Sequence, residues 1–156
     1  MAMAWLWSGF DSRQVHNKNK MANDCIFCKI IKGEIPCTKI YENDKVIAFL
    51  DIVPVNPGHA LIVSKEHFEN IEDLPEGILF EIIKAAKKIA PVIIKAVGSN
   101  SYNLGVNNGK DAGQLVPHVH FHIMPRFEND GYKLWAGKKY AEGEMEKITE
   151  AIRKAL

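Results

Sequence analysis

The sequence predicts an α+β fold, in which a mostly antiparallel sheet of five strands carries one long helix and is followed by a C-terminal helix. Short segments rich in Ile, Val, Tyr and Phe alternate with turn residues, as strands do. One long segment instead repeats its apolar residues at the helical period. The connections between the strands are of hairpin length except across that helix, which favours antiparallel pairing.

The first three strands are predicted in the N-terminal half of the chain. Residues 39–42 and 46–51 flank a turn at residues 43–44, which is typical of a hairpin. Residues 54–58 contain two prolines and a glycine that break the pattern, and an apolar run follows at residues 59–65. We expect this run to join the hairpin as a third strand.

The principal helix is predicted to end at Gly98. Asp73 and Glu76 have the spacing of a capping box, and Pro75 falls in the first turn. Pro91 lies inside the helix, so we expect a kink or a local loss of backbone hydrogen bonding there. The helical period is carried by Leu79, Ile82, Ile83, Ala86, Ala90, Ile93 and Val97.

Two further strands and a closing helix complete the predicted fold. Residues 102–106 and 118–125 have strand character and are joined by the glycine-bearing loop 107–114. The C-terminal segment spaces apolar residues along one side of a helix, and we expect that side to pack against the domain. These residues are Met145, Ile148, Ile152 and Ala155.

Length and composition indicate one globular domain: 156 residues, 47% hydrophobic and 25% charged. We assign residues 21–156 to it and residues 1–20 to a leader or disordered tail, because the apolar start lacks the length and charge of a secretory signal. A net charge of +1 creates no basic field for a nucleic acid polymer, and no apolar run is long enough to span a bilayer. We therefore expect a cytoplasmic protein with neither kind of partner.

The candidate site centres on three histidines at alternate positions, His118, His120 and His122. Alternate side chains of a strand project to the same face, so three imidazoles are expected on one face and apolar residues on the other. Near neutral pH an imidazole is available as a base, a nucleophile or a metal ligand. The loop 107–114 beside them has glycines that allow a close approach to phosphate, although such a cluster is often an ordinary turn.

This segment resembles the histidine triad (HIT) superfamily of nucleotide hydrolases and transferases, and the resemblance covers about residues 24–127. The nearest branch is the small nucleoside phosphoramidase and dinucleoside polyphosphate hydrolase group. The uridylyltransferase branch is less similar, because it has a glutamine where this chain has His122. Besides the triad, the resemblance is carried by the segments 25–31, 48–52, 57–63, 107–109 and 112–114.

The resemblance implies a homodimer and a purine nucleotide or nucleotide conjugate as substrate. It places Asp51 at the position that binds the ribose hydroxyls, with Ile52 and Phe49 as an apolar wall for the base. Leu115 departs from the family pattern, since several relatives have a serine there that reaches the phosphate or the leaving group. Family positions that contact the nucleotide correspond to Asn107, Gly113 and Gln114.

Our first hypothesis for the chemistry is attack by neutral His120 on the α-phosphorus of a nucleotide. The nucleotidyl-histidine intermediate would then be hydrolysed to a nucleoside monophosphate. His59 is a candidate orienter of the imidazoles, and His122 is a candidate donor to the growing negative charge on a phosphate oxygen. The leaving group stays open among phosphoramidates, acyl adenylates and dinucleoside polyphosphates.

A structural zinc site is predicted near the N-terminal end of the domain. Cys25 and Cys28 have the spacing of half a tetrahedral zinc site, although a redox pair has the same spacing. The family resemblance supplies His67 and His118 as the other two ligands; on composition alone His67 is an exposed polar residue. Cys37 has no partner at metal spacing and is expected to be buried.

Two other functions fit the same residues. The three triad histidines could hold one catalytic metal with an open position for activated water, as in a metal-dependent hydrolase. The chain could also be a non-catalytic, nucleotide-binding zinc adaptor. Trp135 either reaches the site of a dimer mate or anchors the tail.

Overall fold

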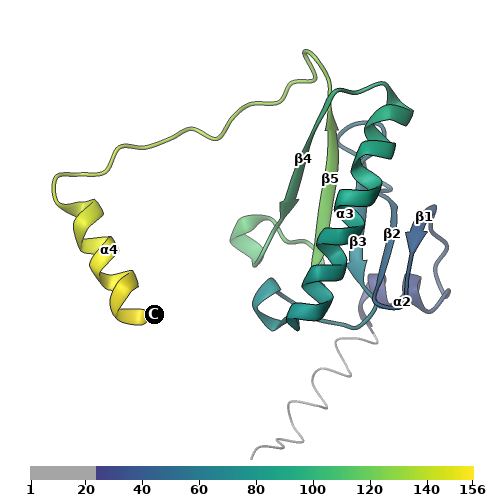
Figure 1. The fold of residues 1–156 in the computed structure, drawn as a ribbon, viewed down its shortest axis with the longest axis horizontal. Helices are drawn as coiled ribbons and strands as arrows, with labels where there is room; N and C mark the ends of the chain where they lie inside the picture. The colour runs from purple at the N-terminus through teal and green to yellow at the C-terminus, as the bar shows by residue number, and fades with distance from the viewer. Residues whose placement is uncertain (1–23) are drawn as a thin grey trace, which may run out of the picture.

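The computed structural model describes residues 24–156 and contains a five-stranded sheet in the order β1-β2-β3-β5-β4. Each adjacent pair of strands is antiparallel, which confirms the predicted fold class (Figure 1). The elements are α2 (Ile26–Ile31), β1 (Lys39–Glu42), β2 (Val46–Leu50), β3 (Ala60–Ser64), η1 (Ile71–Asp73), α3 (Glu76–Val97), β4 (Ser101–Val106), η2 (Lys110–Ala112), β5 (His120–Arg126) and α4 (Glu144–Ala155).

Alternate residues of the central strands point into two separate apolar layers. On one face, Ala48 of β2 and Ile62 of β3 pack with the buried side of α3, which includes Ile82. On the other face, Phe49 and Leu61 pack with the short helix α2 and the cysteines next to it. Burial of each large apolar side chain stabilises the fold by about 1.5–3 kcal/mol. The sheet is thus covered by α3 on one side and by α2 on the other.

The register between β3 and β5 shows on which face of the sheet His120 and His122 lie. His122 lies opposite Leu61, and His120 lies opposite Val63. Both partners belong to the layer under α2, whereas Phe121 between the two histidines points toward α3. The site therefore lies on the face of the sheet opposite the long helix.

The start of α3 differs from the predicted capping box. Asp73 belongs to the separate turn η1, which is closed by the Leu74 N–H donating to the Ile71 carbonyl. Pro75 occupies the N-cap, and no side chain of the described residues caps the helix. The capping box is therefore wrong, because the local turn holds Asp73 away from the helix start.

The rest of α3 follows the prediction. The helix continues through Pro91, whose missing N–H removes the bond to the Lys87 carbonyl. Both residues lie on the exposed side of the helix, where water can bind the freed carbonyl. The helix ends at Gly98, which adopts the left-handed conformation at φ 71° as expected for a C-terminal glycine.

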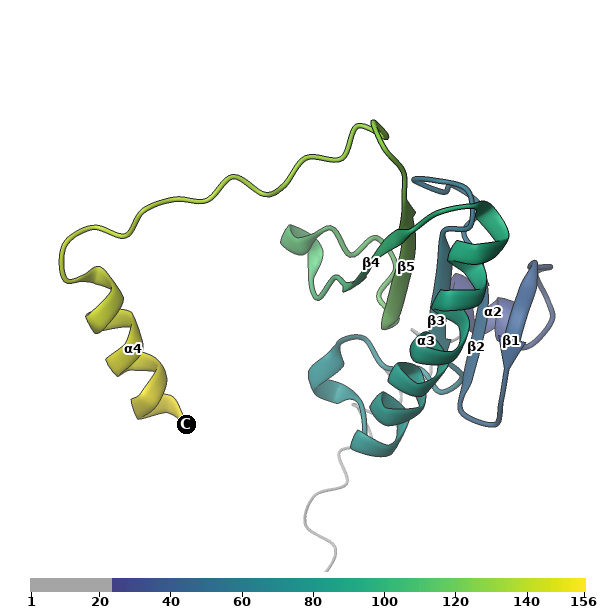
Figure 2. The same ribbon diagram turned by 45° about the horizontal axis from the view of Figure 1, so that its top comes forward.

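The C-terminal helix does not pack as expected. Figure 1 and Figure 2 both show α4 apart from the sheet, at the end of an extended segment. Met145 and Ile152 are 54% and 55% exposed, and α4 buries none of its residues. The predicted packing role is wrong for the single described chain, because no described element covers the apolar side of this helix.

Three smaller predictions can be compared with the structure. β5 begins at His120, so His118 precedes the strand instead of belonging to it. Cys37 is exposed, contrary to the predicted burial, because it lies in the loop before β1. Within residues 24–156, no helix has the length and apolar character needed to cross a membrane. The predicted leader at residues 1–20 lies outside the described residues.

Candidate active site and metal centre

His120 is the buried first residue of β5, and its protonation geometry is fixed by the backbone. Its Nδ1 lies 2.7 Å from the carbonyl oxygen of His118, to which it donates a hydrogen bond. The Nε2 atom of a neutral ring then carries the lone pair. Burial lowers the pKa of His120, partly opposed by the bond to that carbonyl. His120 is therefore held as a neutral imidazole with Nε2 able to act as a nucleophile.

A second imidazole pair lies beside it. The backbone N–H of Val55 donates to His59 Nδ1 over 3.2 Å, so His59 carries its proton on Nε2. His59 Nε2 lies 2.9 Å from His122 Nδ1 and donates to it, which places the proton of His122 on Nε2. That Nε2 is buried and has no hydrogen-bond partner among residues 24–156. The arrangement supplies one unused N–H donor in the site.

Burial keeps both rings of this pair neutral. It lowers the pKa of His59, although the nearby Asp51 carboxylate opposes the shift. It lowers the pKa of His122 to about 4, helped by the neighbouring His120 and His59. The rings of His120 and His122 meet edge to face with centroids 4.8 Å apart. A ring with a free Nε2 lone pair and a ring with a free Nε2–H therefore lie side by side.

The predicted ribose and base residues lie at the end of β2. Asp51 Oδ2 is 3.5 Å from His59 Nδ1, and Asp51 Oδ1 accepts a hydrogen bond from the Val53 N–H. Ile52 is 96% exposed, whereas Phe49 is 4% exposed and meets Phe27 edge-on. Asp51 thus lies beside the histidine pair, Ile52 faces solvent, and Phe49 belongs to the apolar layer under α2.

The loop 107–114 is folded back on itself. The Gln114 side chain accepts from the Gly109 N–H at 2.7 Å and donates to the Glu69 carbonyl at 2.7 Å. The Asn107 amide approaches the Gly113 carbonyl at 3.5 Å. Gly109 and Gly113 both have positive φ, 84° and 86°, which favours glycine. The predicted nucleotide-contact residues therefore form one braced loop directly before the triad.

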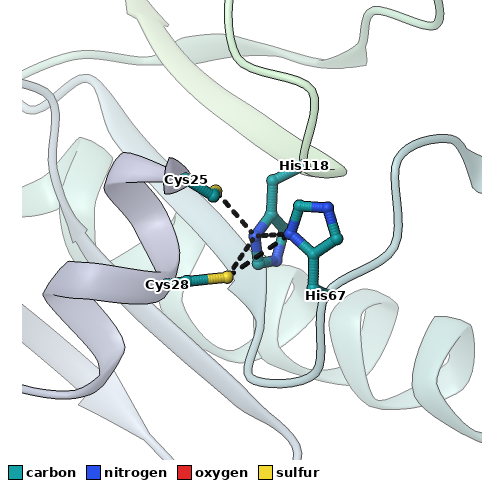
Figure 3. Close-up of side chains that lie close together, drawn as sticks. All are labelled: Cys25, Cys28, His67 and His118. Atoms are coloured by element: carbon teal, nitrogen blue, oxygen red, sulfur yellow. Dashed lines mark hydrogen bonds between the residues drawn. The ribbon is translucent and has the colours of Figure 1, made fainter. Parts of the chain in front are cut away.

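A separate cluster brings the four predicted metal ligands together (Figure 3). His118 Nδ1 is 3.4 Å from Cys25 Sγ and 3.6 Å from Cys28 Sγ. His67 Nδ1 is 3.3 Å from both Cys28 Sγ and His118 Nδ1. Ligand bonds of a tetrahedral zinc ion imply edges of about 3.6 Å between sulfur and nitrogen and about 3.4 Å between nitrogens. Four of the six distances between ligand atoms are thus close to those of that tetrahedron, and all four ligand atoms lie within 4.8 Å of one another, so the cluster could hold a metal ion.

Surrounding groups orient the ligands toward the centre. His118 Nε2 donates to the Ser64 carbonyl over 2.9 Å, which leaves the Nδ1 lone pair facing the cysteines. Burial lowers the pKa of His118 to about 4, so the ring is neutral. Burial, reinforced by Cys25, raises the pKa of Cys28 to about 12. Because metals bind thiolates, metal binding at this cluster must release protons.

The three triad histidines belong to two different clusters: His118 lies with the cysteines, whereas His120 and His122 lie with His59. The expected common face holds for all three histidines, because His118 and His120 both contact Phe27 of the α2 layer, whereas Val119 and Phe121 between them belong to the α3 layer. Both ring nitrogens of His118 are directed at the cysteine cluster and the Ser64 carbonyl. His118 is therefore not available to share one metal ion with His120 and His122. This geometry disfavours the three-histidine metal hydrolase.

The groups that sequence reasoning missed are mainly backbone groups. The Val55 N–H, the His118 carbonyl and the Ser64 carbonyl each fix an imidazole tautomer. Every residue carries such groups, so the residue types contain no signal for them. Phe27, whose ring centroid lies 5.0 Å from that of His120, was missed as well, although it lies between the two cysteines.

Comparison with known proteins identifies the family of this chain. The model of the HIT domain matches residues 32–129. An adenosine 5'-monophosphoramidase of Schizosaccharomyces pombe is 46% identical over 113 residues, which are 72% of this chain and 81% of the relative. An adenylylsulfatase of Arabidopsis thaliana is 43% identical over 131 residues, which are 84% of this chain and 66% of the relative.

Solved structures give the same result. The crystal structure of a HIT family member from Bacillus subtilis superimposes with a TM-score of 0.78 at 39% identity, covering 85% of this chain and 97% of that one. The matched domain model covers more than half of the sequence and includes His120 and His122. The chain belongs to the HIT domain family.

Proposed function

We propose that this protein is a nucleotide hydrolase that cleaves a purine nucleotide conjugate at its α-phosphorus and releases a nucleoside monophosphate. The observation that carries the proposal is His120, a buried neutral imidazole whose Nδ1–H is held by the His118 carbonyl. A fixed tautomer presents the Nε2 lone pair without reorganisation at the moment of attack.

In the first step, the Nε2 lone pair of His120 forms a bond to the α-phosphorus. The bond from phosphorus to the leaving group breaks, and the leaving group departs with that electron pair. His122 donates its free Nε2–H to a non-bridging oxygen as negative charge grows there. The positive charge on the substituted His120 ring is stabilised by the bond from its Nδ1–H to the His118 carbonyl.

In the second step, water attacks the same phosphorus and the bond to His120 Nε2 breaks. The ring recovers its lone pair, and the product leaves as a nucleoside monophosphate. The proton that the attacking water loses passes to the solvent, from which the leaving group takes up the proton that balances its electron pair. The reaction is thereby divided into two displacements of lower barrier. No step requires a metal ion at the phosphorus.

The nucleotide half of the substrate is assigned to the groups around the histidines. Asp51 would bind the ribose hydroxyls, and Ile52 and Phe49 would contact the base. Asn107, Gly113 and Gln114 would bind the phosphates through the braced loop. The relatives' names, a monophosphoramidase and an adenylylsulfatase, support an adenylyl group with varied leaving groups. Phosphoramidates, acyl adenylates and dinucleoside polyphosphates are therefore the substrate classes to test.

We infer further that the cysteine cluster holds zinc. Two thiolates and two imidazoles are the ligand set that zinc prefers, and all four ligand positions come from the protein. A closed site of this kind stabilises the fold instead of activating water. Zinc bound by Cys25, Cys28, His67 and His118 would tie α2 to the start of β5.

We also infer a homodimer and a cytoplasmic location. Exposed apolar residues occur on α3 and on the edge strand β4, including Phe80, Val92 and Leu104. A second copy of the chain that covers them would remove this apolar surface from water.

The proposed cytoplasmic location rests on the cysteines. The free cysteines of a cysteine–histidine cluster suit a reducing compartment.

Hydrolysis of an adenosine phosphoramidate tests the proposal. Wild-type protein should release adenosine monophosphate, and His120→Ala should release none above the uncatalysed rate. His16→Ala is the control, because His16 lies outside the residues 32–129 that match the HIT domain and outside the triad. Product release by His120→Ala at the wild-type rate would refute the assigned nucleophile.

Chelation and binding measurements separate the other functions. Activity that persists after the metal has been removed from folded protein contradicts a metal-dependent hydrolase. A tight complex with adenosine monophosphate and no turnover of any of the three substrate classes would support the non-catalytic adaptor instead.

A further inference from the structure

Asp130 lies outside the candidate site, yet its carboxylate is saturated with hydrogen bonds. Oδ1 accepts from Arg126 Nη2 at 2.6 Å and from the Tyr132 N–H at 2.9 Å. Oδ2 accepts from Asn56 Nδ2 at 2.8 Å and from the Phe127 N–H at 3.0 Å. The side chain is 7% exposed, and these bonds hold its pKa well below the ordinary value. A carboxylate with four donors is a rigid anchor.

Asn56 connects this anchor to the active-site loop between β2 and β3. Its amide donates to Asp130 Oδ2 and also to the Pro125 carbonyl at 2.9 Å. Its own carbonyl accepts from the His59 N–H at 3.1 Å. Asn56 therefore joins the end of β5 to the loop that carries His59.

The loop is also fixed from the side of α3. Gly58 has φ +84°, and a Cβ atom built on it would lie 2.9 Å from Val97 Cγ1 and 3.3 Å from Pro125 Cγ. The backbone at Gly58 is thus in close contact with both α3 and β5. With Asn56 held by Asp130, the loop has few ways to shift relative to β5.

The position of this loop determines where the N–H of Val55, the residue before Asn56, is directed. Its N–H donates to His59 Nδ1, which leaves the proton of His59 on Nε2 and directs it to His122 Nδ1. A shift of the loop would release Nδ1 of His59 and allow the other tautomer. His122 would then lose the constraint that places its own proton on the unused Nε2.

We propose that Asn56 and Asp130 are positioning residues, which hold the loop 51–59 so that the Val55 N–H sets the tautomers of His59 and His122. The proposal rests on the proposed function for its catalytic consequence, because His122 acts there as the donor to phosphate. The tautomers themselves exist in the free protein and can be observed without substrate.

Long-range proton–nitrogen NMR of the imidazoles, recorded on the full chain with its metal bound, tests the tautomers directly. In wild-type protein, His59 and His122 should both carry their proton on Nε2. In Asn56→Ala, we expect averaged nitrogen shifts for both rings, because the second tautomer becomes accessible. Glu128→Gln is the matched control, since this exposed acid lies in the same turn as Asp130.

Kinetics with an adenosine phosphoramidate provide the second measurement. Asn56→Ala should lower kcat by roughly 10- to 100-fold, the range expected when a catalytic group is misplaced by about 1 Å. Asp130→Asn replaces one carboxylate oxygen, which accepts two hydrogen bonds, by an NH2 group that can only donate. This variant should change the same NMR signals and should also lower kcat. Glu128→Gln should keep the wild-type tautomers and kcat.

The outcomes are separable. A proton on Nδ1 of His59 in the wild-type spectrum overturns the proposal, and so does a folded Asn56→Ala protein with wild-type tautomers and kcat. If Asn56→Ala fails to fold, Asp130→Asn and the wild-type spectrum still decide. Absence of hydrolysis by wild-type protein would instead refute the proposed function and leave the tautomer test standing.

Discussion

The tautomers of His120, His59 and His122 are each set by a hydrogen bond to one of the two ring nitrogens. A carbonyl holds the proton of His120 on Nδ1, and the Val55 N–H holds that of His59 on Nε2. His122 follows from His59 through their shared hydrogen bond. Two tautomers of opposite kind thus place a lone pair and an N–H donor side by side, as attack on a phosphate requires.

Burial of His122 predicts an unusual titration. With a pKa of about 4, the ring stays neutral well below the ordinary histidine range. Between about pH 6.5 and 4 the unfolded chain binds a proton that the folded chain does not, so the free energy of unfolding falls as the pH falls. We expect NMR titration to give a pKa near 4 for His122 and a value below 6.5 for His59. Ordinary values for both rings would contradict the neutral pair.

Gly58 predicts a stability loss from close packing. Gly58→Ala places a Cβ at 2.9 Å from Val97 Cγ1 in a left-handed backbone, and we expect a loss of about 2–4 kcal/mol in the free energy of unfolding. Gly98→Ala is the control, because φ is similar and no atom lies within 4 Å. Its loss should be only about 1–2 kcal/mol, the cost of the left-handed conformation alone. Equal losses in urea denaturation would show that the contact does not matter.

At the scale of elements, the metal cluster connects parts of the chain that are distant in sequence. The cysteines flank the start of α2, His67 follows β3, and His118 lies two residues before the start of β5. A metal ion bound there would fix the position of β5, and with it His120 two residues later. The same residues that would stabilise the fold would therefore also position His120, the proposed nucleophile.

Loss of a metal ligand should destabilise the protein. Cys28→Ser should reduce the zinc content of the purified protein and lower the free energy of unfolding by about 3 kcal/mol, at free zinc about 100-fold above the Kd. Cys37→Ser should change neither, because Cys37 is exposed and separate from the cluster. Wild-type protein that contains no zinc and has the stability of Cys28→Ser would contradict the site.

The strands and helices were predictable because their periods differ. Strand-forming residues around a turn indicated β1 and β2, an apolar run indicated β3, alternation indicated β5, and the helical repeat indicated α3 with its end at Gly98. The capping box failed because Asp73 forms a turn of its own. The ligand and triad residue types were visible in the sequence, whereas the tautomers depend on backbone groups placed by loops. Those contacts appear only after the chain is folded.

At the scale of the whole molecule, the described chain leaves apolar surface uncovered. Helix α4 exposes its apolar side, and the edge strand β4 exposes Leu104. Sequence periodicity identified α4 but could not identify the surface that covers it. An amphipathic pattern predicts that one side of a helix is buried, and it does not indicate which surface buries that side. A second copy of the chain is the partner that we propose.

Sedimentation equilibrium checks the dimer. The full chain should sediment as a dimer, and Leu104→Lys should shift it toward the monomer, because a charge would be buried at the edge of β4. Ile40→Lys is the control, since Ile40 is 40% exposed on the opposite edge strand β1, compared with 44% for Leu104. A full chain that stays monomeric at about 100 μM, well above the Kd of a stable homodimer, would contradict the assembly.

The proposed mechanism depends on a transient bond between phosphorus and His120 Nε2. Rapid acid-free quenching of the protein during turnover of an adenylyl conjugate labelled at the α-phosphorus, followed by peptide mapping, measures it directly. We expect the label on the peptide that contains His120, and its loss in His120→Ala. Label on another side chain, or none during rapid product formation by wild-type protein, would contradict the mechanism.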